Sequence, residues 1–175
     1  LWRRTSSSGA VLVGDLLLCE AMNLLLETRD HCLLAAFMSR VTTVCLTEAR
    51  QELVYRGRQV DEQTCLELAG GKTGALFEFV AEACAGDDAA LAAAMARAGY
   101  CVGTAYQLAD DMLDTTGCEA QAGKTLGTDH KREKFTLPQM APSGADMSIS
   151  HVRSLCREAA QVLEPWPAAR SAVDD

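Results

Sequence analysis

Residues 103–114 read Gly-Thr-Ala-Tyr-Gln-Leu-Ala-Asp-Asp-Met-Leu-Asp. On an α-helix, residues three and four apart share a face, so Gln107 lies one turn before Asp110 and Asp111, and Asp114 lies one turn after them. Like charges this close repel each other unless water solvates them or a cation offsets the repulsion. Carboxylate and amide oxygens without neighbouring Cys or His suit a hard cation such as Mg²⁺. The stretch therefore predicts a helix that carries a magnesium site.

Cationic residues follow this helix in a turn-rich segment. Residues 123–138 read Gly-Lys-Thr-Leu-Gly-Thr-Asp-His-Lys-Arg-Glu-Lys-Phe-Thr-Leu-Pro. Glycine permits the sharp turn that would bring Lys124 and Lys134 toward one anion, and carboxylates for a metal beside lysines for an anion describe a diphosphate bound through magnesium. An acidic, solvated helix end followed by an ordinary basic loop explains the same residues equally well.

A family resemblance favours the first interpretation. The blocks at 106–114, 123–129 and 134–138, in this order and spacing, resemble the second aspartate-rich region of the trans-type polyprenyl diphosphate synthases. The resemblance implies an all-α helical bundle of the isoprenoid synthase type. It also implies that Asp110, Asp111 and Asp114 bind Mg²⁺, and that Lys124 and Lys134 bind the substrate diphosphate.

Two earlier segments extend the resemblance. Residues 72–77, Lys-Thr-Gly-Ala-Leu-Phe, resemble the segment in which the family's lysine contacts the allylic diphosphate and its threonine lies near the reacting carbon. This implies that Lys72, Thr73 and Gln107 are catalytic, and that Lys72 also binds substrate. Gln51 matches a substrate-facing position, whereas Arg50 stands where the family has glycine and Val54 where it has a polar residue.

Composition sets the broad class. The chain has 175 residues, of which 49% are hydrophobic and 23% charged, so one domain over residues 1–175 with a sizeable core is expected. The net charge of −8 argues against nucleic acid as a partner. The 8 cysteines are scattered without a C-x-x-C pair, which predicts reduced thiols. Charged residues interrupt every apolar run, so we expect no transmembrane segment and a cytoplasmic protein.

The periodicity predicts helices throughout and no strand. The first begins near Ala10 and is apolar nearly all round, so it should be buried, with Gly14 allowing a neighbour to approach. The remaining helices are expected, with their caps, at 30–56 (ended by Gly57), 62–85 (begun by Asp61), 88–114 and 149–164.

The resemblance covers residues 10–172 and corresponds to the C-terminal part of a synthase, so the bundle is expected to be truncated on its N-terminal side. The family's first aspartate motif would lie upstream of Leu1. In one interpretation, the chain is part of a prenyltransferase that condenses an allylic prenyl diphosphate with isopentenyl diphosphate. In the other, it is a non-catalytic or regulatory subunit of a heteromeric synthase.

Two further expectations follow from the resemblance. A homodimer, or a heterodimer with a related synthase subunit, is expected in either interpretation. If the chain begins at Leu1, we expect it to make no prenyl product alone. A class I terpene cyclase would share the diphosphate chemistry, but the blocks at 123–129 and 134–138 point away from that class.

Overall fold

The computed structural model describes residues 6–117, 127, 133–140 and 143–174, and all regular structure in these ranges is helical. This confirms the predicted all-α class. The elements are α1 (Ser7–Glu27), α2 (His31–Arg50), the π-helical turn η1 (Gln51–Tyr55), α3 (Glu62–Ala69), the π-helical turn η2 (Gly70–Gly74), α4 (Ala75–Ala83), α5 (Ala89–Thr116), the 3₁₀ turn η3 (Leu137–Gln139), α8 (Gly144–Val162) and α9 (Pro167–Asp174).

The chain forms two compact units, Leu1–Ser39 and Arg40–Asp175, whose boundary falls within α2. In the first unit, Ser6 caps α1, and its Oγ accepts a hydrogen bond from Gly9 N at 3.0 Å. No residue of α1 is buried. The predicted burial of this helix is therefore wrong, because a helix that is apolar on every side needs neighbours on every side to be covered.

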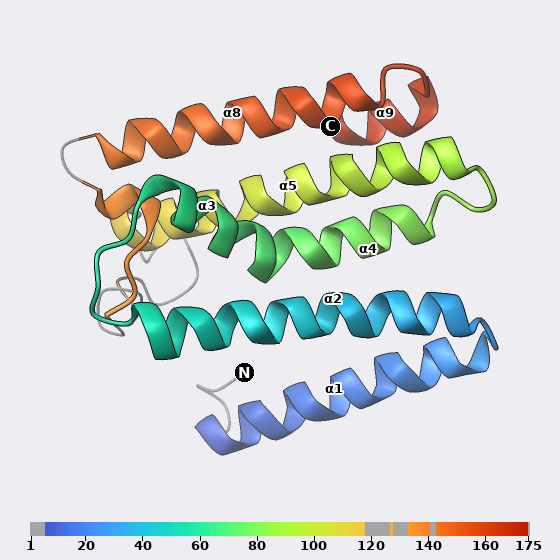
Figure 1. Ribbon diagram of the computed structural model, residues 1–175, viewed down its shortest axis with the longest axis horizontal. Helices are drawn as coiled ribbons and strands as arrows, with labels where there is room; N and C mark the ends of the chain where they lie inside the picture. The colour runs from blue at the N-terminus through green and yellow to red at the C-terminus, as the bar shows by residue number, and fades with distance from the viewer. Residues whose placement is uncertain (1–5, 118–126, 128–132, 141–142, 175) are drawn as a thin grey trace. The chain divides into compact units, whose positions relative to one another are not determined.

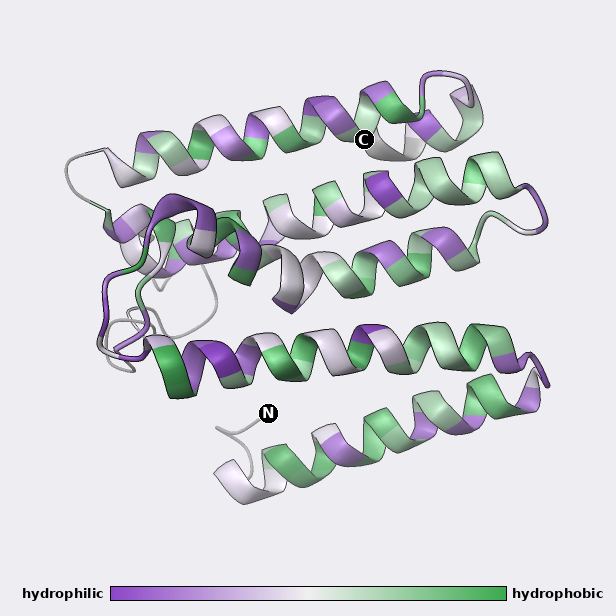
Figure 2. Ribbon diagram, in the orientation of Figure 1, coloured by the Kyte–Doolittle hydropathy of each residue, from purple (hydrophilic) through white to green (hydrophobic). Residues whose placement is uncertain are grey.

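Two helical segments are long and apolar enough to cross a membrane by length and composition, namely Ser7–Glu27 and His31–Tyr55. Figure 2 shows hydrophobic residues along much of α1. The charged residues in these runs therefore do not prevent the two helices from meeting this criterion of length and composition. A core helix of a soluble protein passes the same test, so the finding is weak evidence for a membrane.

In the second unit, α5 packs between α4 and α8 (Figure 1). Two glycines of α5 lie against α4. A Cβ added to Gly99 would lie 2.5 Å from Phe77 O, and one added to Gly103 would lie 2.8 Å from Phe77 Cβ. Because glycine has no side chain at these two positions, α5 can approach α4 closely. This contact fixes the register of α5, the helix that carries the aspartates.

The core of this unit contains two clusters of buried residues. One consists of Cys65, Ala69, Leu108 and Leu137, and the other of Ala98, Cys101, Ala159 and Leu163. The seven cysteines that the structure describes are free thiols, as predicted.

The predicted helix ends are confirmed at three positions. Asp61 accepts a hydrogen bond from Thr64 N at 2.8 Å, and Asp88 accepts from Ala90 N and Leu91 N. Gly57 follows the end of η1 with a φ of +69°, the left-handed conformation that favours glycine.

The last long helix departs from its prediction, because α8 begins at Gly144 rather than near residue 149. A Cβ on Gly144 would lie 2.4 Å from Leu137 O, so the first turn of α8 packs directly on η3. Ser148, fully buried, donates a hydrogen bond to Gly144 O. Tertiary packing thus overrides the loop-like composition of this stretch.

Candidate active site

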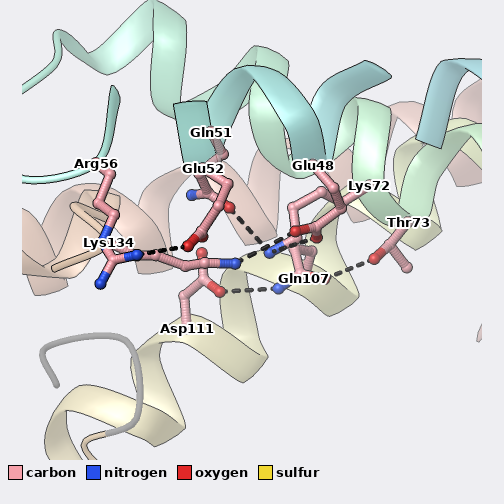
Figure 3. Close-up of polar contacts among 9 residues, drawn as sticks. All are labelled: Glu48, Gln51, Glu52, Arg56, Lys72, Thr73, Gln107, Asp111 and Lys134. Carbon is pink, nitrogen blue, oxygen red and sulfur yellow. Dashed lines mark hydrogen bonds and ion pairs between the residues drawn. The ribbon is translucent and has the colours of Figure 1, made fainter. Parts of the chain in front are cut away.

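Lys72 and Thr73 lie on η2, a π-helical turn that joins α3 to α4. Such turns occur often at functional sites, because the wider ring changes the direction of side chains relative to the rest of the helix. The ammonium Nζ of Lys72 lies 3.3 Å from Glu48 Oε1 and 3.4 Å from Gln51 Oε1 (Figure 3). The structure thus brings two of the predicted site residues, Lys72 and Gln51, into contact.

Lys134 reaches the same place from a segment far along the chain. Its neighbour Glu133 accepts a backbone hydrogen bond from Gly57 N at 2.8 Å, and its side chain pairs with Arg56 at 3.3 Å. These contacts anchor the segment beside the end of η1. The Nζ of Lys134 then lies 3.2 Å from Glu48 Oε2, and its side chain is only 9% exposed.

Glu48 joins the two lysines, and sequence reasoning did not find it. Burial would raise the pKa of the Glu48 carboxyl, but the nearby charges of Lys72 and Lys134 and their hydrogen bonds outweigh burial and hold this pKa below its ordinary value. Glu48 precedes Gln51 by three residues, so it shares a helix face with a predicted site residue. This spacing is the sequence feature that could have indicated Glu48 as a site residue.

A second set of contacts links η2 to α5. Thr73 Oγ1 donates a hydrogen bond to Gln107 Oε1 at 2.6 Å, and Gln107 Nε2 donates to Asp111 Oδ1 at 2.8 Å (Figure 3). The side-chain oxygen of Gln107 accepts from Thr73 and its side-chain nitrogen donates to Asp111, so the two hydrogen bonds together fix the orientation of the Gln107 amide. Thr73 from one predicted motif and Gln107 and Asp111 from another therefore form one series of hydrogen bonds.

The three aspartates lie on the last turns of α5, where Asp111 and Asp114 are buried and Asp110 is half-buried. Among the described residues, no three acidic, His or Cys side chains converge closely enough to enclose a metal ion. Mg²⁺ is usually bound through one or two carboxylates together with substrate phosphates and water. An all-oxygen set of carboxylates on one helix end fits that mode of binding.

Lys124 lies outside the described residues. The chain is described again at Gly127, whose N–H donates to Asp114 O at 3.1 Å, so this position lies against the end of α5. Gly127 has a φ of +67°, as a sharp turn after the helix requires.

Thr136 is a second residue that sequence reasoning missed. Its side chain is 5% exposed, and among the described side chains its Oγ1 is the buried polar atom without a hydrogen-bond partner. It lines a small cavity whose other polar walls are Gln51, Lys72 and Asp111. An unpaired buried hydroxyl is costly. Thr136 lies within the block at 134–138, but its presence in that block gave it no role of its own.

The sequence model of the polyprenyl synthetase family matches residues 1–156. The chain belongs to this family. The geranylgeranyl diphosphate synthase of Mycobacterium tuberculosis is 32% identical over 152 residues, which cover 81% of this chain and 42% of that protein. The chain spans less than half the length of the curated polyprenyl synthetase relatives it matches.

Solved structures of polyprenyl synthetase relatives share the fold. The polyprenyl synthase of Caulobacter crescentus, solved with calcium and isoprenyl diphosphate, aligns with a TM-score of 0.87 at 24% identity and covers 98% of this chain and 65% of that one. The geranyltransferase of Helicobacter pylori, solved with magnesium and isoprenyl diphosphate, aligns with a TM-score of 0.79 at 19% identity, over 99% of this chain and 61% of that one. The isoprenoid synthase fold is therefore shown.

Arg50 and Val54, the two residues that the sequence analysis interprets as departures from the family pattern, are both exposed. The guanidinium of Arg50 lies 3.5 Å from Glu67 Oε2 and donates a hydrogen bond to the hydroxyl of Tyr55 at 2.6 Å. Val54 is 47% exposed on η1. Arg50 is thus paired with groups other than Lys72, Gln51 and Glu48.

Proposed function

We propose that this chain supplies the C-terminal part of the active site of a trans-prenyltransferase, which condenses an allylic prenyl diphosphate with isopentenyl diphosphate. One observation carries the proposal. Residues from three separate motifs meet at one place, with Lys72 and Lys134 on one side and the chain Thr73–Gln107–Asp111 on the other. Membership of the polyprenyl synthetase family supports the same reaction class.

The lysines bind the diphosphate in this proposal. Lys72 and Lys134 present two ammonium groups from different segments to one partner, and both are largely buried. Charge–charge interactions are stronger where water is excluded, so amines fixed in advance stabilise the negative charge that collects on a departing diphosphate. Lys124 contributes a third amine from the segment after α5.

Asp110, Asp111 and Asp114 would hold Mg²⁺. The bound ion would supply positive charge that neutralises the diphosphate leaving group. Asp111 also accepts a hydrogen bond from Gln107, so one carboxylate takes part in both the acidic helix end and the hydrogen-bonded chain.

Thr73 and Gln107 line the reacting centre. Gln107 Nε2 is committed to Asp111, so its carbonyl oxygen faces Thr73 and accepts from it. The fixed oxygens of both side chains can face the positive charge that develops on the allylic carbon when the carbon–oxygen bond breaks. The double bond of isopentenyl diphosphate then attacks this carbon, and loss of a proton completes the condensation. Gln51 Oε1 accepts a hydrogen bond from Lys72 Nζ and so helps to hold this lysine in place.

The enzyme works in the cytoplasm as a homodimer, or as a heterodimer with a related synthase subunit, in this proposal. The support for a dimer is the composition of α1, where several leucines and Val11 are exposed in a single copy of the chain. Leucines exposed on one helix in such number are expected to be covered by another protein surface.

Binding of an unreactive substrate analogue tests the proposal with the chain itself. We expect geranyl thiolodiphosphate to bind in isothermal titration calorimetry with magnesium chloride and to lose this affinity in EDTA. Lys72→Met should weaken binding by about tenfold or more, since a charge-assisted contact is lost. Arg153→Gln, which removes a cation from the exposed face of α8, is the control and should change nothing. Binding that is indifferent to both EDTA and Lys72→Met would overturn the proposal.

A further inference from the structure

Glu48 occupies a position between two amines that the proposed function assigns to the substrate. Its Oε1 lies 3.3 Å from Lys72 Nζ, and its Oε2 lies 3.2 Å from Lys134 Nζ (Figure 3). One carboxylate therefore bridges both lysines, as a bound anion would do. The side chains of Lys72 and Lys134 are 18% and 9% exposed, so water could take the place of the Glu48 carboxylate only in part.

The bridge has two physical consequences. Two ammonium groups that face one position repel each other, and an anion between them removes that repulsion and keeps both in place. The same anion must leave, or share its partners, before a ligand can bind to these amines. The pKa of Glu48 lies below its ordinary value, so the side chain is charged at neutral pH and competes fully.

We propose that Glu48 is a specificity-determining residue that competes for Lys72 and Lys134, so that an anion must carry enough charge and enough acceptor oxygens to replace a carboxylate bridging both. This inference rests on the proposed function of the two lysines. Diphosphate meets the requirement, because it offers several oxygens and more than two negative charges. Inorganic phosphate carries less charge and fewer oxygens, so it displaces Glu48 less readily.

Glu52 provides a matched control. It lies one helical turn after Glu48, and both side chains are 43% exposed. Its carboxylate pairs with Arg56 at 3.0 Å instead of with the lysines. Glu48→Gln and Glu52→Gln therefore remove the same charge from nearly the same place, and only the first removes the bridge.

The experiment is calorimetric titration of the full chain and its two variants with inorganic pyrophosphate and, separately, inorganic phosphate, at constant magnesium chloride. Two partly exposed ion pairs correspond to a factor of roughly ten in an equilibrium constant. We expect Glu48→Gln to tighten pyrophosphate binding by about tenfold and phosphate binding by a larger factor, and so to reduce the preference for pyrophosphate. Glu52→Gln should stay within about twofold of the wild type.

Unchanged or weaker pyrophosphate binding by Glu48→Gln would overturn the inference while leaving the proposed function in place, provided that the wild type binds. No pyrophosphate binding by any of the three proteins would overturn both. Thermal unfolding followed by circular dichroism checks that each variant is folded. Glu48→Met, of similar length and without charge, repeats the test if the glutamine variant is unfolded, and the same outcomes apply.

Discussion

At the scale of single residues, Thr136 combines deep burial with an unpaired hydroxyl. Thr136→Val replaces that hydroxyl with a methyl group of similar size, so it removes a desolvation cost without opening a cavity. We expect the free energy of unfolding in urea to rise by about 1 kcal/mol.

Thr104→Val is the control for this substitution. Thr104 is 3% exposed, but its Oγ1 donates to Tyr100 O at 2.7 Å, so the variant loses a satisfied hydrogen bond. Its unfolding free energy should fall or stay the same. A clear loss of stability in Thr136→Val would contradict the prediction and would mean that the hydroxyl has a partner in solution, such as a water in the adjoining cavity.

The buried thiol of Cys65 allows a chemical test. Burial raises its pKa to about 11, and the charges of Asp111 and Asp61 contribute in the same direction. At pH 8 about one molecule in a thousand then carries the reactive thiolate at this position. In a time course with iodoacetamide, read by mass spectrometry, Cys65 should react far more slowly than the exposed Cys156. Comparable rates would show that the segment around Cys65 opens readily.

Residue types in known motifs were predictable from the sequence, whereas their neighbours from other segments were not. Spacing marked Gln107 and Asp111, which share a helix face, and these residues do form a hydrogen bond. The Lys134–Glu48 pair joins residues 86 positions apart. Nothing in local periodicity encodes such a contact, because it depends on the path of the chain after α5.

At the scale of elements, the packing of α5 on α4 depends on two glycines. Gly99→Ala adds a methyl group within 2.5 Å of the backbone oxygen of Phe77, which cannot move without shifting α4. We expect the unfolding free energy to fall by about 1–3 kcal/mol, even though alanine favours helix by up to about 1 kcal/mol.

Gly14→Ala separates packing from helix propensity, because an added Cβ at Gly14 meets no atom within 4 Å. The expected close neighbour of Gly14 is thus not found among the residues that the structure describes. This variant should retain or increase the helical circular dichroism signal, whereas Gly99→Ala should lower the unfolding midpoint. Equal effects of the two substitutions would show that α4 and α5 pack less tightly than described.

Helix ends were easier to predict than irregularities inside helices. The caps Asp61 and Asp88 act through backbone donors two or three residues away, so local sequence is sufficient to indicate them. The π-helical turns η1 and η2 interrupt ranges that were predicted as continuous helix. They place Gln51 and Lys72 beside each other through tertiary contacts, which helix periodicity alone does not reveal.

At the scale of the whole molecule, α1 exposes apolar side chains that include Val11, Leu12, Leu16 and Leu17. Composition predicted a buried helix, but α1 is exposed in the structure, because composition alone does not specify which surface would cover a helix. A membrane is a poor candidate, since Asp15 and Glu20 lie near the middle of this helix and a charged residue there costs about 3 kcal/mol. A protein surface can instead pair or solvate both carboxylates at its rim.

A second subunit on α1 would make the state of association depend on its leucines. Leu16 and Leu17 are 69% and 67% exposed, so replacing both with Gln removes much apolar surface from an interface without touching the core. Sedimentation velocity should show the wild type as a dimer and the double variant shifted toward monomer, whereas Ile149→Gln on α8 should sediment as the wild type does. Flotation with phosphatidylcholine–phosphatidylglycerol vesicles separates the membrane alternative. A wild type that floats with vesicles, and a double variant whose sedimentation is unchanged, would contradict pairing through α1, because polar substitutions at an interface must weaken its association.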